Sequence, residues 1–449
     1  MNLSFDNIKR SWKSDQRFID ADVKNFHVIY FAFLIGLIAG VTSSVFRLTL
    51  SYLDNFRDEL FSAAGYSGIS SYILPILYSV IGILTALYLV KSFAPEASGS
   101  GVQEIEGALD EIRAIRWKQV LPVKFIASLF SLGSGLLLGR EGPTIQIGAN
   151  LGKMVKDIFR QNEDKTNLFV SAGAAAGLAS AFNAPLAGII FVIEEMHGHF
   201  RYTFFSFASI MVASGTSDFV VRSLIGTDPV IKMSIFPAPD LTSIWLFILL
   251  GLLFSVLGYF FNKMLVISLD FFSHLSKIIL VLAVIVVGLL VASAGIFHPK
   301  MIGGGYDTIR EVLDKSNTMK FLVGLFSVRL ILTIFSYGTG VPGGIFAPLL
   351  ALGVTFGMLF GIVIHHAFPE IILQPGIFAV AGMAAIFAST VRAPLTGLVL
   401  AVEMTSNFEL ILPLIITTVT ASAVTAKLGN QPIYTTLLKR TQEKKVQEK

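Results

Sequence analysis

The sequence has no cysteine and little charge. Only 14% of its 449 residues are Asp, Glu, Lys or Arg, against about a quarter in an ordinary soluble domain. Without cysteine, the chain can form no disulfide, zinc–thiolate site, iron–sulfur cluster or catalytic thiolate. His197 and His199 have a metal-like spacing, but they lack a nearby third ligand. We therefore expect neither a metal nor a cofactor.

Apolar residues take the place of the missing charge. Hydrophobic residues make up 54% of the chain, and the mean hydropathy is +0.73. Because this character extends over the whole length, the sequence predicts an all-α polytopic membrane protein. Its basic residues are not interleaved with aromatic ones on a polar module, which argues against nucleic acid as a partner.

The formal net charge of +4 arises in the C-terminal tail, where six basic and two acidic residues follow from Lys427 onward. Short basic segments remain cytoplasmic, so this tail and a basic N-terminal segment predict that both termini lie inside the cell. The first apolar run begins near Val28 without a short core and a small-residue cleavage site. We therefore expect no removable signal peptide.

Long apolar stretches follow one another along the chain, and several are interrupted by Gly, Pro or charge, as at Asn183-Ala184-Pro185. A broken helix at membrane depth is tolerated only where it is buried in protein or lines a wet cavity. The breaks therefore indicate a functional site inside the membrane part of the protein. The stretches span residues 28–53, 71–90, 119–138, 167–193, 203–224, 241–269, 278–297, 321–338, 345–368, 376–402 and 409–428.

The chain contains an internal repeat. Residues 179–188 align without a gap on residues 388–397, and the same offset of 209 pairs Glu194 with Glu403. Two related halves with interrupted helices are typical of transporters whose site lies where the repeats meet. The sequence alone leaves open whether the halves are inverted or parallel.

Three glycine motifs each precede an apolar run. They are Gly99-Ser100-Gly101-Val102, Gly139-Arg140-Glu141-Gly142-Pro143 and Gly343-Gly344-Ile345-Phe346-Ala347-Pro348. Glycine allows close approach of a ligand, and a helix start offers unpaired N–H groups and a positive dipole end. If the three starts converge, amides and the Ser100 hydroxyl could hold a halide without Lys or Arg. Each motif alone is also compatible with tight helix packing.

Some acidic residues within or beside the apolar stretches are candidates for chemistry. Glu141, at a predicted helix start, must pair, take up a proton or compete with an anion, and it could therefore act as a gate. The alternative is a salt bridge to an arginine such as Arg140. Glu194 recurs in the second half as Glu403, which indicates a structural role. Glu195 aligns with Met404 and is a candidate proton acceptor, or else a solvated acid at a helix end.

Together, the three motifs and the late Tyr434 resemble the CLC family of chloride channels and transporters over nearly the whole chain. The resemblance implies a homodimer in which each subunit has an anion pathway between two inverted repeats. It implies that Ser100, Tyr434 and the amides of Ile345 and Phe346 bind the anion. The remaining filter-forming residues would be Gly99, Gly101, Val102, Gly139, Arg140, Gly142, Pro143, Gly343, Gly344, Ala347 and Pro348.

The resemblance also assigns roles to the acids. Glu141 would be the external gating glutamate, and Glu195 the internal proton acceptor common in the exchangers of the family. The chain is thus expected to exchange chloride for protons. Alternatives are a passive voltage- or pH-gated chloride channel, or a fluoride- or nitrate-selective member, against which Ser100 argues. Gln103 departs from the Pro found in many bacterial members.

The expected organisation has four parts: a cytoplasmic N-terminal segment (1–26), two membrane repeats (27–225 and 226–434) and a short basic cytoplasmic tail (435–449). This tail leaves no room for the paired regulatory domains of eukaryotic relatives. We expect a prokaryotic protein of the plasma (inner) membrane, with chloride, protons, lipid and a second copy of the chain as partners.

No base recurs in both halves and no Gly-x-Ser-x-Gly motif is present, so we do not expect an enzyme.

Overall fold

A computed structural model describes residues 26–64, 70–162, 166–196, 203–314, 317–370 and 374–447. Within these ranges all the regular elements are helices, and the only strand-like pairings are two isolated backbone bridges. The predicted all-α fold is confirmed. His197, His199 and nearly all of the N-terminal segment lie outside the described residues.

Among the described residues, the first half of the chain contains eight α-helices. They are α2 (His27–Ser62), α3 (Ser70–Phe93), α4 (Val102–Leu109), α5 (Trp117–Gly133), α6 (Glu141–Ile158), α7 (Thr166–Phe182), α8 (Pro185–Glu195) and α9 (Phe204–Ile225). The second half contains α10 (Ile244–His274), α11 (Lys277–Phe297), α12 (Tyr306–Asp314), α13 (Met319–Gly338), α14 (Phe346–Ala367), α15 (Gly376–Thr390), α16 (Pro394–Thr405) and α17 (Ile411–Lys427). A final helix, α18 (Ile433–Gln447), packs against α4.

Eight helices in the described part of the chain are long and apolar enough to cross a membrane. They are α2, α3, α9, α10, α11, α13, α14 and α17 with its preceding turn. Many large apolar side chains on them are exposed, including Phe33, Phe260 and Ile278. Lipid tails are as apolar as these side chains, so this surface suits a bilayer. The chain is a multi-pass membrane protein.

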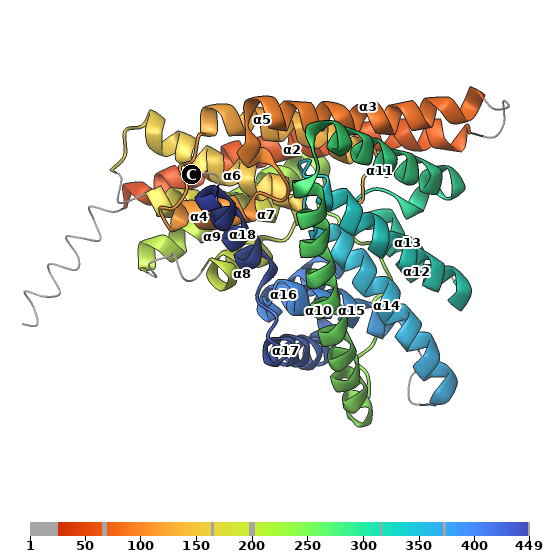
Figure 1. The fold of residues 1–449 in the computed structure, drawn as a ribbon. Coiled ribbons are helices and arrows are strands. Elements are labelled where there is room, and N and C mark those ends of the chain that lie inside the picture. Colours follow the sequence, from red (N-terminus) through yellow and green to blue (C-terminus); the bar gives the residue numbers. More distant parts are fainter. Residues whose placement is uncertain are drawn as a thin grey trace, which may run out of the picture.

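The two halves repeat the same packing. Helix α2 packs on α9 as α10 packs on α17, and α6 packs on α7 as α14 packs on α15. Figure 1 shows the first half, red to yellow-green, along the top and left, and most of the second half, green to blue, below it and to the right. The apolar stretches 167–193 and 376–402 are each divided into two helices at the predicted breaks, where Asn183 and Arg392 adopt positive φ.

The repeat is inverted, as the contact between α8 and α16 shows. The Glu194 carboxylate at the end of α8 accepts the backbone N–H groups of Leu395 and Thr396 at the start of α16, at 3.0 and 2.7 Å. In return, the Glu403 carboxylate near the end of α16 accepts N–H groups at the start of α8, at 3.1 and 2.7 Å. Equivalent helices therefore run antiparallel, and the acids that the halves share cap each other's helices.

Helices α6 and α7 approach closely because glycines face each other across the contact. A Cβ added to Gly148 would lie 2.1 Å from the Gly173 carbonyl oxygen. In the second half, a Cβ on Gly353 would lie 2.4 Å from the Gly382 carbonyl oxygen. Almost every residue of α7 and α15 is buried. This packing places the starts of α6 and α14 inside the protein, away from lipid.

Candidate anion site between the two halves

The three glycine motifs meet in space. Gly99 donates its N–H to the Val341 carbonyl and accepts from the Gly343 N–H, at 3.2 and 3.0 Å. Gly139 and Gly344 exchange two N–H···O bonds of 2.7 Å each. Residues more than 200 positions apart are therefore held together by backbone hydrogen bonds, and the starts of α4, α6 and α14 share one buried region.

The loop of residues 99–101, which we call the Ser100 loop, is held in place by the start of α6 and by Lys124. Gly99 and Gly101 have φ of 60° and 87°, which glycine adopts without strain. A Cβ on Gly142 would lie 2.3 Å from Ser100 Oγ, so the start of α6 rests directly on this loop. Fully buried Lys124 donates from Nζ to the carbonyls of Ala97 and Gly99, at 2.9 and 2.7 Å. Gln103 occupies the second position of α4, which still begins at Val102.

Two buried hydroxyl groups face this region. Ser100 and Tyr434 are both fully buried, and neither hydroxyl has a hydrogen-bond partner within the described residues. The Tyr434 ring packs on the Phe346 ring, with 5.7 Å between centroids. Phe346 is the first residue of α14, and Ile345 is its N-cap. Buried hydroxyls without a partner are costly, so their natural occupant is a ligand that accepts hydrogen bonds.

The Glu141 side chain extends from the start of its own helix, α6, into the protein interior. The side chain is fully buried, and its Oε2 accepts the Ala347 N–H at 3.4 Å. The carboxylate thus lies at the start of α14, where an anion is favoured by the helix dipole. Its Oε1 accepts a hydrogen bond from the Tyr306 hydroxyl at 2.5 Å. Arg140 does not turn to Glu141 but donates to the Ala181 carbonyl.

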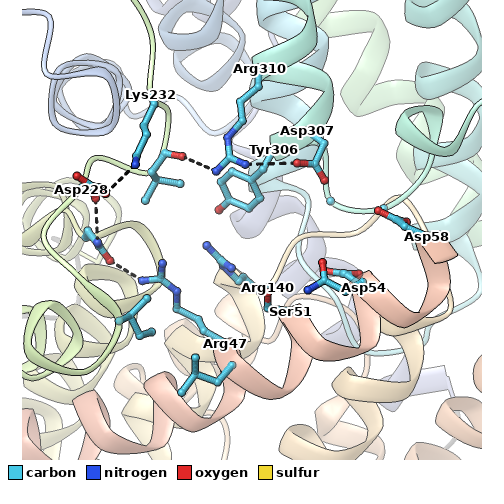
Figure 2. Close-up of a pocket in the computed structure, with 18 of the residues that line it drawn as sticks. Arg47, Ser51, Asp54, Asp58, Arg140, Asp228, Lys232, Tyr306, Asp307 and Arg310 are labelled. Atoms are coloured by element: carbon cyan, nitrogen blue, oxygen red, sulfur yellow. Dashed lines mark hydrogen bonds and ion pairs between the residues drawn. The ribbon is translucent and has the colours of Figure 1, made fainter.

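A cavity of about 410 Å³ opens beside Tyr306 and Arg140. Figure 2 shows Arg140 and Arg47 pointing toward the centre of this cavity, below Tyr306. Ion pairs lie at its edge, between Lys232 and Asp228 at 2.7 Å and between Arg310 and Asp307 at 3.5 Å. Charged groups of both signs line this cavity, which we call the vestibule, and its lining residue Tyr306 contacts Glu141.

A second cavity, of about 260 Å³, lies on the other side of the Ser100 loop. It is lined by Gly99, Gln103 and Tyr337 and by Arg440 of α18. The Tyr337 hydroxyl accepts the Ser100 N–H at 3.4 Å. The buried region that holds Ser100 is therefore approached by a cavity from each side.

Glu195 lies apart from Glu141, on the side of Tyr434. Its carboxyl group is within hydrogen-bonding reach of that of Glu106 on α4, and both lie close enough to Tyr434 to act on it electrostatically. Each of the two acids has one buried oxygen without a partner among the described residues. Two charged carboxylates in contact would repel strongly in a low-dielectric interior, so such a pair is suited to share a proton.

Sequence patterns missed four residues of this region: Lys124, Glu106, Tyr306 and Tyr337. Lys124 gave a usable signal, because a charge inside the apolar stretch 119–138 requires a buried partner. Glu106 looks like a solvated acid on a short polar helix. The tyrosines resemble ordinary core residues, and only the structure brings their hydroxyls to the motifs.

Helices that break around a buried, hydroxyl-lined site between inverted halves define a membrane transport protein of the anion-conducting kind. The family model described as voltage gated chloride channel matches residues 82–426. The chain belongs to this CLC family, and the resemblance of its motifs is confirmed.

Similar proteins with assigned activities cover almost the whole chain. The H(+)/Cl(-) exchange transporter ClcA of Vibrio campbellii is 45% identical over 93% of this chain and 90% of its own length. The ClcA transporter of Salmonella typhi is 39% identical, over 97% and 93% of the two chains. A crystal structure of a slow cyanobacterial Cl−/H+ antiporter is similar, with a TM-score of 0.89, 36% identity and coverage of 92% and 97%.

Proposed function

We propose that this protein is a secondary active transporter that exchanges chloride for protons across the membrane. The observation that carries the proposal is the position of two acids, buried Glu141 and half-buried Glu195, on different sides of one hydroxyl-lined site. A passive channel needs no acid on the Tyr434 side. The names of the similar transporters, which specify exchange, support the same conclusion.

The anion is held by hydroxyl and amide groups. The unpartnered hydroxyls of Ser100 and Tyr434, with the amides of Ile345 and Phe346 at the start of α14, form a set of donors without a full positive charge. A direct Lys or Arg ligand in a low-dielectric site would bind chloride too tightly for release. Lys124 instead binds the carbonyls behind the Ser100 loop, which positions its donors.

Glu141 opens and closes the vestibule side. Its ionised carboxylate at the start of α14 occupies a position that suits an anion, so it competes with chloride there. Protonation removes the charge and with it the attraction to the helix start. The carboxyl group then swings into the vestibule and frees the position for chloride. The filter-forming glycines keep the backbone N–H groups close enough to this position to bind the carboxylate and chloride in turn.

Glu195 and Glu106 provide the proton on the opposite side. A proton shared between their carboxyl groups is available to the region of Tyr434 without passing through lipid. Glu195 is the acceptor that sequence comparison of the halves singles out, since Met404 replaces it in the second half. Proton movement through this pair and chloride movement through the site are coupled at Glu141.

The same proposal places the protein in the plasma (inner) membrane of a prokaryote as a homodimer, surrounded by lipid, with both termini cytoplasmic. The exposed apolar faces of the long helices supply the area for lipid and for a second copy. Residues 27–225 and 226–434 act as the two membrane repeats, and residues 1–26 and 435–449 as cytoplasmic ends.

The test uses purified protein in liposomes with an imposed chloride gradient and a pH electrode outside. We expect protons to move against their own gradient in the wild type. In Glu195→Gln this proton movement should disappear while chloride flux persists, because an amide cannot titrate.

Glu194→Gln is the matched control. The Glu194 carboxylate lies next to Glu195 in sequence but caps α16, so this variant should retain the coupling of proton and chloride movement. Chloride flux without any proton movement in the wild type would instead establish a passive channel.

A further inference from the structure

Tyr306 is the first residue of α12, and its hydroxyl reaches Glu141 across 165 residues of sequence. The two oxygen atoms are 2.5 Å apart, within the range of O–H···O hydrogen bonds. The ionised carboxylate can only accept, so the phenol is the donor. Glu141 is therefore held at two points, by the Ala347 N–H at the start of α14 and by the Tyr306 hydroxyl on the vestibule side.

The segment that carries Tyr306 is rigidly supported. The fully buried guanidinium of Arg329 donates to the carbonyls of Met301 and Gly303, each at 3.1 Å, and to Thr308 Oγ1 at 2.9 Å. Its bonds thus bracket Tyr306 on both sides in sequence. Gly305, with φ of 112°, makes the turn directly before α12. The position of the phenol is set by this scaffold rather than by Glu141.

Two cations strengthen the phenol as a donor. The Arg140 guanidinium lies over the Tyr306 ring, 4.7 Å from its centroid, and Arg47 acts electrostatically on the same phenol. Positive charge next to a hydroxyl polarises its O–H bond toward the acceptor. Arg140 itself is kept in place by the Ala181 carbonyl. The arrangement favours a hydrogen bond to a negatively charged partner.

We propose that Tyr306 is a positioning residue that holds the ionised Glu141 carboxylate in its closed position. The inference rests on the proposed role of Glu141 as the gate. The hydroxyl bond is strong only while the carboxylate is charged, so it slows opening when Glu141 is ionised and releases it after protonation. Tyr306 thereby sets how fast and at which pH the vestibule side opens.

Charged groups of both signs surround this contact. They come from four elements: Arg47 and Asp54 from α2, Arg140 at the start of α6, Asp218 from α9 and Asp307 from α12. Asp218 and Asp307 each pair with an arginine of their own helix.

Tyr306→Phe removes the hydroxyl and retains the ring that Arg140 covers. In liposomes at pH 7.5, we expect chloride turnover to rise roughly tenfold, which corresponds to about 1.4 kcal/mol. The acid limb of the pH profile should move upward by about one pH unit, since the carboxylate loses a donor that favours its charged form. At pH 4.5 the two proteins should transport at similar rates.

A second arm tests whether the effect passes through the charge of Glu141. In a Glu141→Gln background, Tyr306→Phe should change turnover by less than about twofold, because the difference between the two backgrounds measures the coupling of the pair. Tyr52→Phe, on an exposed surface of α2, is the matched loss of a hydroxyl and should change neither rate nor profile.

Unchanged turnover and pH profile in Tyr306→Phe would overturn the proposal, as would an equal acceleration with and without Glu141. Proton movement is recorded in the same vesicles. If the wild type moves no protons, exchange is wrong as the function, whereas acceleration by Tyr306→Phe would still support the hydroxyl as the restraint on Glu141.

Discussion

The two halves of the protein share their helix packing but differ where the chemistry lies. Glu194 and Glu403 occupy equivalent positions and make equivalent caps, and Asn183 and Arg392 make the same left-handed turn. By contrast, α6 begins with Glu141 and α14 with Phe346, and Glu195 has Met404 as its counterpart. Features repeated in both halves build the fold, whereas features present in one half equip the site.

The largest expected effect follows from removing the acid that only the first half carries at its helix start. In Glu141→Gln, proton movement should be abolished while chloride flux persists, because the amide retains the shape and cannot titrate. The measurement is the proton and chloride flux of the purified variant in liposomes. Unaltered proton coupling would remove Glu141 from the mechanism. It would also contradict the conclusion that features present in only one half equip the site.

A smaller effect is expected from Ser100, a hydroxyl that only the first of the glycine motifs supplies. Ser100→Pro removes both its hydroxyl and the N–H that contacts Tyr337. Loss of a hydrogen bond to a charged ligand should lower the preference for chloride over nitrate by roughly tenfold. Competition between the two anions in flux assays measures it. Ser100→Ala separates the hydroxyl from the backbone effect, and an unchanged ratio in both variants would exclude Ser100 from the filter.

The smallest effect is expected from an acid that both halves share. Glu403→Gln replaces one of the two oxygens that accept N–H groups at the start of α8, which should cost about 1 kcal/mol of stability. Thermal unfolding in detergent measures the loss. Glu194→Gln should behave alike, and exposed Glu409→Gln should leave the unfolding temperature unchanged. A change in proton coupling without loss of stability would show that the shared acids are not merely structural.

The sequence was sufficient to predict the helical fold, the repeat and the broken helices, because hydropathy, glycine motifs and a constant offset are local signals. It also singled out Glu141 and Glu195, since acids in apolar stretches are rare. It could not find Tyr306, whose hydroxyl meets Glu141 only through tertiary packing. Nor could it distinguish Glu106 from a solvated acid, because burial of a short helix depends on neighbours far along the chain.

The exchanged caps of α8 and α16 have a consequence for how access to the site alternates. Each half supplies the carboxylate that completes a helix of the other, and the Gly139–Gly344 and Gly99–Gly343 backbone bonds tie the halves again at the site. A rocking motion of one repeat against the other, common among transporters, would break all of these bonds at once. We therefore expect the transport cycle to leave the halves docked, with the swing of a single side chain as its principal motion.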